Sequence, residues 1–189
     1  MTQRLLLAAV LGGVTMFMWG AFSHMVLNFE GSMIRQVPNE PAVTAVLKEN
    51  IKEDGVYALP GVDMTRQPSP EEMSAWSAAY ERGPTAMLFY HTRGTDVFTP
   101  HQFGVQFLAD FGAALFGSII LLLAGVSWAR GILISTLIGL GGWCALEIPY
   151  WDWYRFPWEF IRADLIDQVA GWLLAGVVMA FFLRARRTA

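Results

Sequence analysis

The sequence predicts an all-α membrane protein with four transmembrane helices and a small α/β extracytoplasmic cap between the first and second helices. Composition is the first reason: 54% of the 189 residues are hydrophobic and only 15% are charged, whereas a soluble domain carries about 25% charged residues. The second reason is that the apolar residues form four long runs, since about 20 such residues span a bilayer core.

The four runs define the predicted spans and divide the chain into three parts. The spans cover residues 5–27, 103–128, 131–148 and 161–183. Only Ala129 and Arg130 separate the second span from the third, which predicts a tight helical hairpin. The first run is too long for a secretory signal, so we expect a retained helix. The predicted parts are helix one (1–27), the cap (28–102) and helices two to four with a basic tail (103–189).

The distribution of arginines predicts the direction of the spans. Cytoplasmic loops carry an excess of Lys and Arg, and five arginines fall at one set of helix ends: Arg4, Arg130, Arg184, Arg186 and Arg187. Residues 28–102 contain six Lys and Arg against ten Asp and Glu, which suits an extracytoplasmic loop. We therefore expect both termini in the cytoplasm and the cap outside.

The pattern of the cap predicts two helices and two short strands. Helical spacing covers residues 40–53, and a second helix starts at Ser69 with Pro70 and two acidic residues, the signature of a capped helix N-terminus. Residues 56–59 and 85–92 are strand candidates that could pair. Thr99 and Pro100 cap the second transmembrane helix in the same way.

Each transmembrane helix brings an ionisable group to the same outer layer of the predicted bundle. These residues are His24, Asp110, Glu147, Asp164 and Asp167. An ionisable residue in hydrocarbon is costly, so it normally faces the bundle interior and has a partner.

Three interpretations of this layer compete. One imidazole with several carboxylates suits a cation or divalent metal site, although no HExxH or ExxH spacing is present. Carboxylates that exchange protons from the outer side would instead form a proton relay. The structural alternative is helix capping and interfacial ion pairing, with Arg155 or Arg162 close to Asp164 and Asp167.

Residues 150–160, between the third and fourth spans, contain seven aromatic residues in eleven positions. Trp and Tyr prefer the membrane interface, so the segment is an anchor or a platform for a lipid headgroup, a quinone ring or a partner subunit. The candidate docking residues are Trp151, Trp153, Arg155 and Trp158.

Small residues recur at four-residue intervals in all four spans, as in Ala109-Ala113-Gly117 and Ser135-Gly139. Such rows let membrane helices approach closely. They predict a compact bundle or packing onto other membrane subunits, and the sequence leaves both open.

Several function classes have no support in the sequence. A net charge of −3 without a basic stripe argues against nucleic-acid binding. The single Cys144 allows no intramolecular disulfide and is expected to be an inert buried thiol. There is no GxSxG, Walker or dinucleotide-binding pattern, and no cofactor is specified.

The run from Gly13 to Gly20, the following Ser23-His24-Met25, the 55–61 loop and the three later helices resemble a group of small uncharacterised bacterial inner-membrane proteins. The resemblance implies a bacterial inner-membrane location and four spans, and it supplies no catalytic residue. We therefore expect a non-enzymatic accessory or scaffolding subunit of a larger membrane assembly, in contact with lipid and other subunits. The alternative is a protein that handles a cation, metal or proton at the outer ends of the helices.

Overall fold

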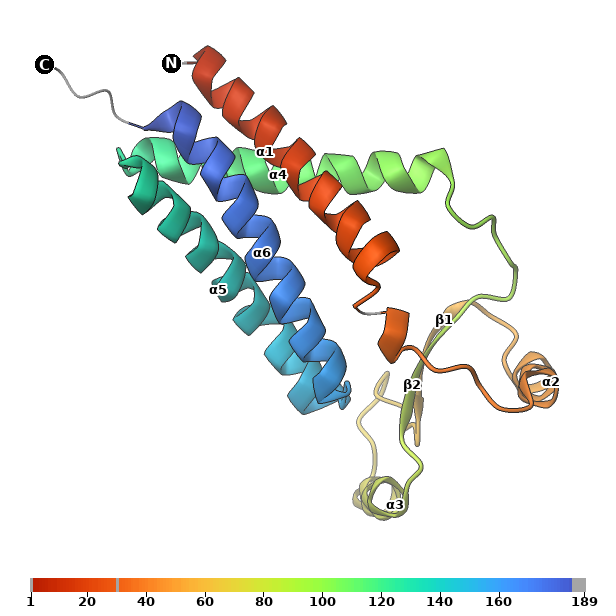
Figure 1. The fold of residues 1–189 in the computed structure, drawn as a ribbon. Helices are drawn as coiled ribbons and strands as arrows, with labels where there is room; N and C mark the ends of the chain where they lie inside the picture. The colour runs from red at the N-terminus through yellow and green to blue at the C-terminus, as the bar shows by residue number, and fades with distance from the viewer. Residues whose placement is uncertain (1, 30, 185–189) are drawn as a thin grey trace, which may run out of the picture. The chain divides into compact units, whose positions relative to one another are not determined.

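The computed structural model describes residues 2–29 and 31–184, and most of them are helical. Four helical segments of 24 to 27 residues are long and apolar enough to cross a membrane, as expected of a multi-pass membrane protein. They are α1 (Thr2–Phe22) with the π-helical turn η1 (Ser23–Leu27), α4 (Pro100–Leu123), α5 (Trp128–Tyr154) and α6 (Trp158–Leu183) (Figure 1). The chain divides into two compact units, and residues 36–96 form the second, which lies within the predicted cap.

Hydroxyl side chains set the start of two of the long helices. Thr99 Oγ1 accepts a hydrogen bond from the Gln102 backbone N–H, and Gln102 Oε1 accepts one from the Thr99 N–H at 2.7 Å. Ser127 caps α5 in a similar way by accepting from the Arg130 N–H. The first cap was predicted at this position, whereas the α4–α5 turn lies before Ser127 rather than at residues 129–130. Gly125, with a φ of 55°, makes that earlier turn possible.

Helix α5 is longer than the predicted third span, because it continues through Pro149 to Tyr154. Proline removes one backbone hydrogen bond from a helix. Aromatic side chains in the helical turn after Pro149 contact one another, and the Tyr150 and Tyr154 ring centroids lie 5.7 Å apart. Eight of the eleven residues of the predicted aromatic connection are therefore helical, and only residues 155–157 join α5 to α6.

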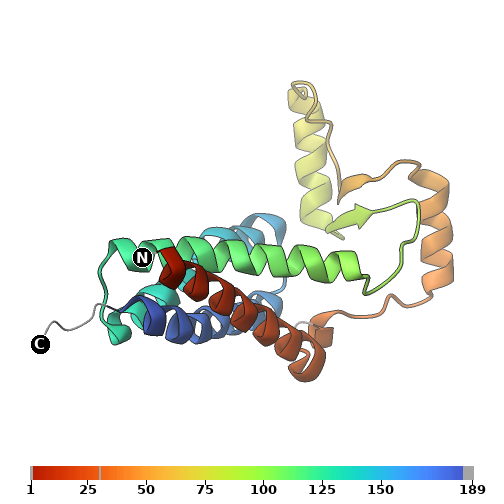
Figure 2. The same cartoon turned by 90° about the horizontal axis from the view of Figure 1, so that it is seen from above.

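The long helices pack in pairs around α1 and α6. Helix α1 packs against both α4 and α6, and α5 lies alongside α6 (Figures 1 and 2). The Arg4 guanidinium donates to the backbone oxygens of Phe182 at 2.7 Å and Arg184 at 3.0 Å. The start of α1 and the end of α6 therefore meet at one end of the bundle.

Small residues allow these close approaches. A Cβ atom added at Gly139 of α5 would lie 2.6 Å from Trp172 Cδ1, and one added at Gly131 would lie 2.5 Å from Ala180 Cβ. Gly12 of α1 faces Met179 of α6 in the same manner. The sequence left open whether the rows of small residues pack helices within this chain or pack onto other subunits. Several of these residues pack helices of this chain against one another.

The second unit contains α2 (Glu40–Asn50), β1 (Gly55–Leu59), α3 (Pro70–Arg82) and β2 (Ala86–Tyr90). The two strands pair antiparallel, with Tyr57 opposite Leu88, as the pattern predicted. The rings of Tyr57 and Tyr90 meet edge to face at 6.5 Å. Neither helix contains a fully buried residue, so polar contacts carry much of the local order.

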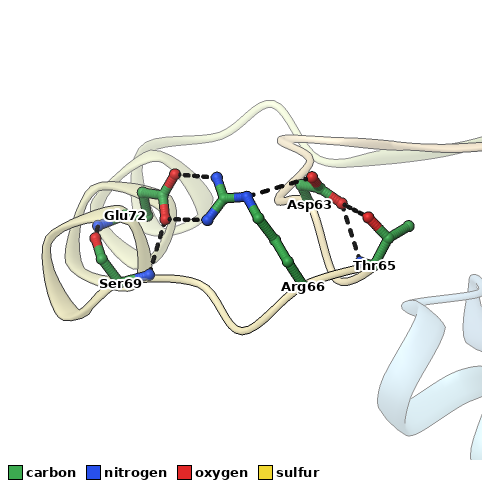
Figure 3. A network of polar contacts seen from close by, with 5 residues as sticks. All are labelled: Asp63, Thr65, Arg66, Ser69 and Glu72. Atoms are coloured by element: carbon green, nitrogen blue, oxygen red, sulfur yellow. Dashed lines mark hydrogen bonds and ion pairs between the residues drawn. The ribbon is translucent and has the colours of Figure 1, made fainter.

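One polar network fixes the start of α3 (Figure 3). Ser69 and Glu72 form a capping box, and the Arg66 guanidinium donates to both Glu72 carboxylate oxygens, at 2.9 Å to Oε2. Arg66 Nε also lies 3.5 Å from Asp63 Oδ2, and Asp63 accepts hydrogen bonds from Thr65. The hydrogen bonds from Arg66 and from the Ser69 backbone lower the pKa of Glu72 to about 2.

The depressed pKa of Glu72 makes the stability of α3 depend on pH. Its contribution is fully present above the ordinary glutamate pKa and is lost as the pH falls towards about 2. We expect Glu72→Gln to flatten the pH dependence of α3 protection between pH 5 and pH 2, measured by hydrogen exchange on the full chain. Glu71→Gln, in the same helical turn, is the matched control and should keep the wild-type profile. Equal profiles in all three proteins would contradict the network.

The contact of Gly139 with Trp172 predicts a specific packing defect. Gly139→Ala forces the indole away from α5, and overpacking of this kind costs about 1–3 kcal/mol. We expect a lower thermal midpoint in detergent, followed by circular dichroism. Gly142→Ala is the matched control on the same helix, because no atom lies within 4 Å of an added Cβ there. A loss of stability in both variants, or in neither, would argue against this packing.

Candidate functional site: a polar pocket between α1, α4 and α6

A pocket of about 470 Å³ lies between three of the long helices. Its lining comes from the last turns of α1 with η1, from Phe98 and the first half of α4, and from α6 as far as Trp172. Because the start of α1 meets the end of α6, these segments lie towards the opposite end of the bundle. This is the end at which the sequence placed the layer of ionisable groups.

Four of the five predicted ionisable residues line this pocket. They are His24 of η1, Asp110 of α4, and Asp164 and Asp167 of α6. Glu147 of α5 is not among the lining residues. The difference follows from packing, since α5 lies against α6 and has few contacts with the other two pocket helices.

Contacts within the pocket link several of its polar groups. Gln106 Nε2 donates to Asp110 Oδ1 at 3.1 Å, one helical turn apart on α4. His24 Nε2 lies 3.9 Å from Asp167 Oδ2, which is an ion-pair distance when the imidazole is protonated. The other oxygen of Asp167, Oδ1, is buried and has no hydrogen-bond partner among the described residues. A buried acceptor without a partner is costly, so the described residues do not fully compensate the carboxylate of Asp167.

The carboxyl groups of the pocket outnumber its basic side chains. Three carboxyl groups and one imidazole line it, and none of its described lining residues is Lys or Arg. The described residues also contain no group of three or more His, Cys, Asp or Glu arranged to hold a metal ion. The assignment of His24, Asp110, Glu147, Asp164 and Asp167 as metal ligands stays a prediction.

A π-helical turn places His24 at the pocket. Helix α1 gives way to η1 at Ser23, whose hydroxyl donates to the Gly20 carbonyl at 3.2 Å, and the turn ends at Asn28 with a φ of 50°. π-Helical turns are rare in proteins, and those that occur often lie at functional sites. Hydrophobic periodicity cannot reveal one, because the change of winding covers only five residues.

Aromatic side chains form much of the remaining wall of the pocket, and the sequence did not predict their role there. They are Phe17, Trp19, Phe98, Phe103 and Trp172. The Trp19 indole N–H donates to the Asp167 backbone oxygen at 3.1 Å, and its ring lies against Gly171. A signal was present in α1, where Phe17, Gly20 and His24 follow helical spacing and share one face.

The aromatic hairpin at residues 150–160 packs partly on itself. The Trp151 and Trp158 rings meet at 5.5 Å, and Arg155 ends α5 with a φ of 62°. Trp153 is 77% exposed. Trp151, Trp153, Arg155 and Trp158 stay predicted docking residues, since no partner or lipid tests them.

Cys144 is exposed on the surface of α5, and the expectation of a buried thiol was wrong. An apolar sequence neighbourhood does not distinguish a face packed inside the bundle from one that lies on its surface. Trp143, the preceding residue, occupies the buried face instead and donates its indole N–H to the Ile161 oxygen at 2.9 Å.

Comparisons with protein-family models, with curated proteins and with solved structures found no match to this chain. The resemblance to small bacterial inner-membrane proteins stays a prediction.

Proposed function

We propose that this chain is a multi-pass membrane protein that binds a cationic species, the proton included, in the pocket between α1, α4 and α6. The observation that carries the proposal is the set of three carboxyl groups lining the pocket, with no Lys or Arg among the described lining residues. A single imidazole, His24, is their one titratable counterpart there.

The pocket lining contains three carboxyl groups and one imidazole. A carboxylate at the edge of a low-dielectric bundle is stabilised by hydrogen bonds, by a positive partner or by uptake of a proton. His24 approaches one oxygen of Asp167, and Gln106 satisfies one oxygen of Asp110. Asp167 Oδ1 is buried without a hydrogen-bond partner among the described residues, and the described lining has no Lys or Arg, so the pocket favours uptake of positive charge from outside the chain.

The proposed orientation places both termini in the cytoplasm of a bacterial cell and the pocket towards the outer side of the inner membrane. This orientation is supported by the position of helix ends that carry arginine residues, which lie together at one end of the bundle. The Arg4 guanidinium donates to a backbone oxygen at the end of α6. Trp128, two residues before Arg130 at the start of α5, donates to Val177 O near the same end. Positive residues favour the cytoplasmic side, and the pocket lies towards the other end.

Neutralising a single pocket carboxyl tests this function. We expect Asp167→Asn to abolish most of the saturable thermal stabilisation that a bound cation gives the wild type in detergent. That stabilisation is worth about 2.7 kcal/mol at a hundred times the dissociation constant. The measurement is scanning fluorimetry at pH 7 across Na⁺, Ca²⁺, Mn²⁺ and alkylammonium salts.

The matched control for this test is Asp152→Asn, because Asp152 is exposed on α5 and lies outside the pocket. It should keep the wild-type response. Equal stabilisation of wild type and Asp167→Asn by every cation would contradict cation binding at this site.

A second candidate function is the non-enzymatic accessory or scaffolding subunit that the sequence favoured. The exposed aromatic hairpin supports it, since Trp151, Trp153 and Trp158 are each at least 44% exposed. Aromatic residues with Arg155 among them are typical of interface hot spots. The small-residue rows give this candidate less support than the sequence suggested, because several of them are occupied by contacts within the chain.

Removal of two exposed tryptophan side chains of the hairpin tests the accessory role. We expect the double variant Trp151→Ala, Trp153→Ala to lose co-purifying subunits by native mass spectrometry of protein extracted gently from its host membranes. Phe116→Ala is the control, because Phe116 is 68% exposed on α4, away from the hairpin sequence. Retention of the same subunits by the double variant would argue against docking through the hairpin.

A further inference from the structure

The pocket is much larger than a bare metal ion needs. Its volume of about 470 Å³ lies within the range of about 300–1,000 Å³ that is typical of small-molecule sites. A metal ion instead needs several ligand atoms at about 2.0–2.6 Å from one point. The described part of the chain has no cluster of three or more His, Cys, Asp or Glu that could supply them. The space therefore suits an organic molecule.

The aromatic wall suits a cation that carries an apolar body. Trp19 is held in place by its hydrogen bond to the Asp167 backbone, and Trp172 by its contact with Gly139. Phe103 adds a third ring at the start of α4. Aromatic faces attract cations within about 6 Å, and Trp does so most strongly. Rings fixed by packing bind without paying the entropy of ordering.

The carboxylate of Asp167 supplies a matching polar group. Its Oδ1 atom is buried without a hydrogen-bond partner among the described residues, so the negative charge is not fully compensated there. The side chain as a whole is 18% exposed, and its accessible part can contact a ligand. The 3.9 Å from Oδ2 to His24 Nε2 is too long for a hydrogen bond. An ionised carboxylate only accepts hydrogen bonds, so the group that completes it must donate one. The N–H of a protonated amine does so and brings the compensating charge.

We infer that the pocket binds a protonated primary amine with an apolar body, with its ammonium group at Asp167 and its body against Trp19, Trp172 and Phe103. This inference rests on the proposed function and narrows it from cations in general to organic ammonium ions. Two sources offer this chemistry: a free amine and the ethanolamine headgroup of a phospholipid.

The test is isothermal titration calorimetry of the full-length protein in phosphatidylglycerol nanodiscs, with 2-phenylethylamine as the probe. The neutral isostere 2-phenylethanol measures binding that needs no charge. We expect saturable binding of the amine and at least tenfold weaker binding of the alcohol, because a charge-assisted hydrogen bond is lost. Equal affinities for the two probes would overturn the inference.

Two variants localise the binding. Asp167→Asn should weaken binding of the amine by about tenfold or more. Asp152→Asn in the same nanodiscs should bind the amine with the wild-type affinity. Phe103→Leu keeps Asp167 and removes one aromatic ring, so it should weaken binding of the amine by about two- to fivefold. Phe116→Leu is the control for this variant. Unchanged affinity in both Asp167→Asn and Phe103→Leu would place the amine elsewhere and overturn the inference.

Competition separates this inference from the proposed function and distinguishes the two sources. Binding of Ca²⁺ or Mn²⁺ that requires Asp167, without amine binding, would overturn the inference and keep the proposed function. The absence of Asp167-dependent binding by any cation would overturn both. Phosphatidylethanolamine in the nanodiscs should displace the probe if a lipid headgroup is the natural occupant. Undiminished probe binding in that lipid would support a free amine.

Discussion

The insertion of one large side chain between glycines of two neighbouring helices is the contact on which the pocket depends. Trp172 of α6 lies over Gly139 of α5 and Gly117 of α4, and a Cβ atom at either position would come within 3 Å of its ring. The same indole lines the pocket. The helix spacing that gives the bundle its packing thus also sets one wall of the candidate site.

The two ends of the helical bundle differ in chemistry. At one end an arginine bonds backbone oxygens at the end of α6, so its charge meets the unsatisfied carbonyls of a helix C-terminus. Towards the other end lie the pocket carboxyl groups, near the first turns of α6 and the first half of α4. At most 28% of each apolar window is buried within the chain, so lipid or other protein has a large apolar surface to cover.

Much of the fold could be predicted from the sequence, because strong local signals specify it. The four apolar runs, the Thr99-Pro100 cap, the start of α3 and the strand pair of the second unit all follow from composition, capping residues and alternation. The errors arose where tertiary packing decides. Pro149 lies inside α5 although proline usually ends helices, and Cys144 is on the surface although its neighbours are apolar.

The candidate site was predicted in part. Counting residues along each helix predicted that His24, Asp110, Asp164 and Asp167 lie in one layer. All four line the pocket. The rotation of each helix about its axis is set by side-chain packing, so sequence depth alone could not exclude Glu147. The aromatic wall was also missed, because single aromatic residues in apolar helices are indistinguishable from core or lipid-facing positions before the packing is known.

The central claim is that the pocket carries negative charge and opens towards the outer side of the membrane. The most direct measurement is the labelling rate of Gln168→Cys, in a Cys144→Ser background, with membrane-impermeant thiosulfonates added from outside. Gln168 lines the pocket, and a negative site steers cations inwards. We expect the trimethylammonium reagent to react at least about tenfold faster than the sulfonate reagent, after correction for their intrinsic rates. Equal rates, faster labelling by the anion, or labelling only from the cytoplasmic side would contradict the account.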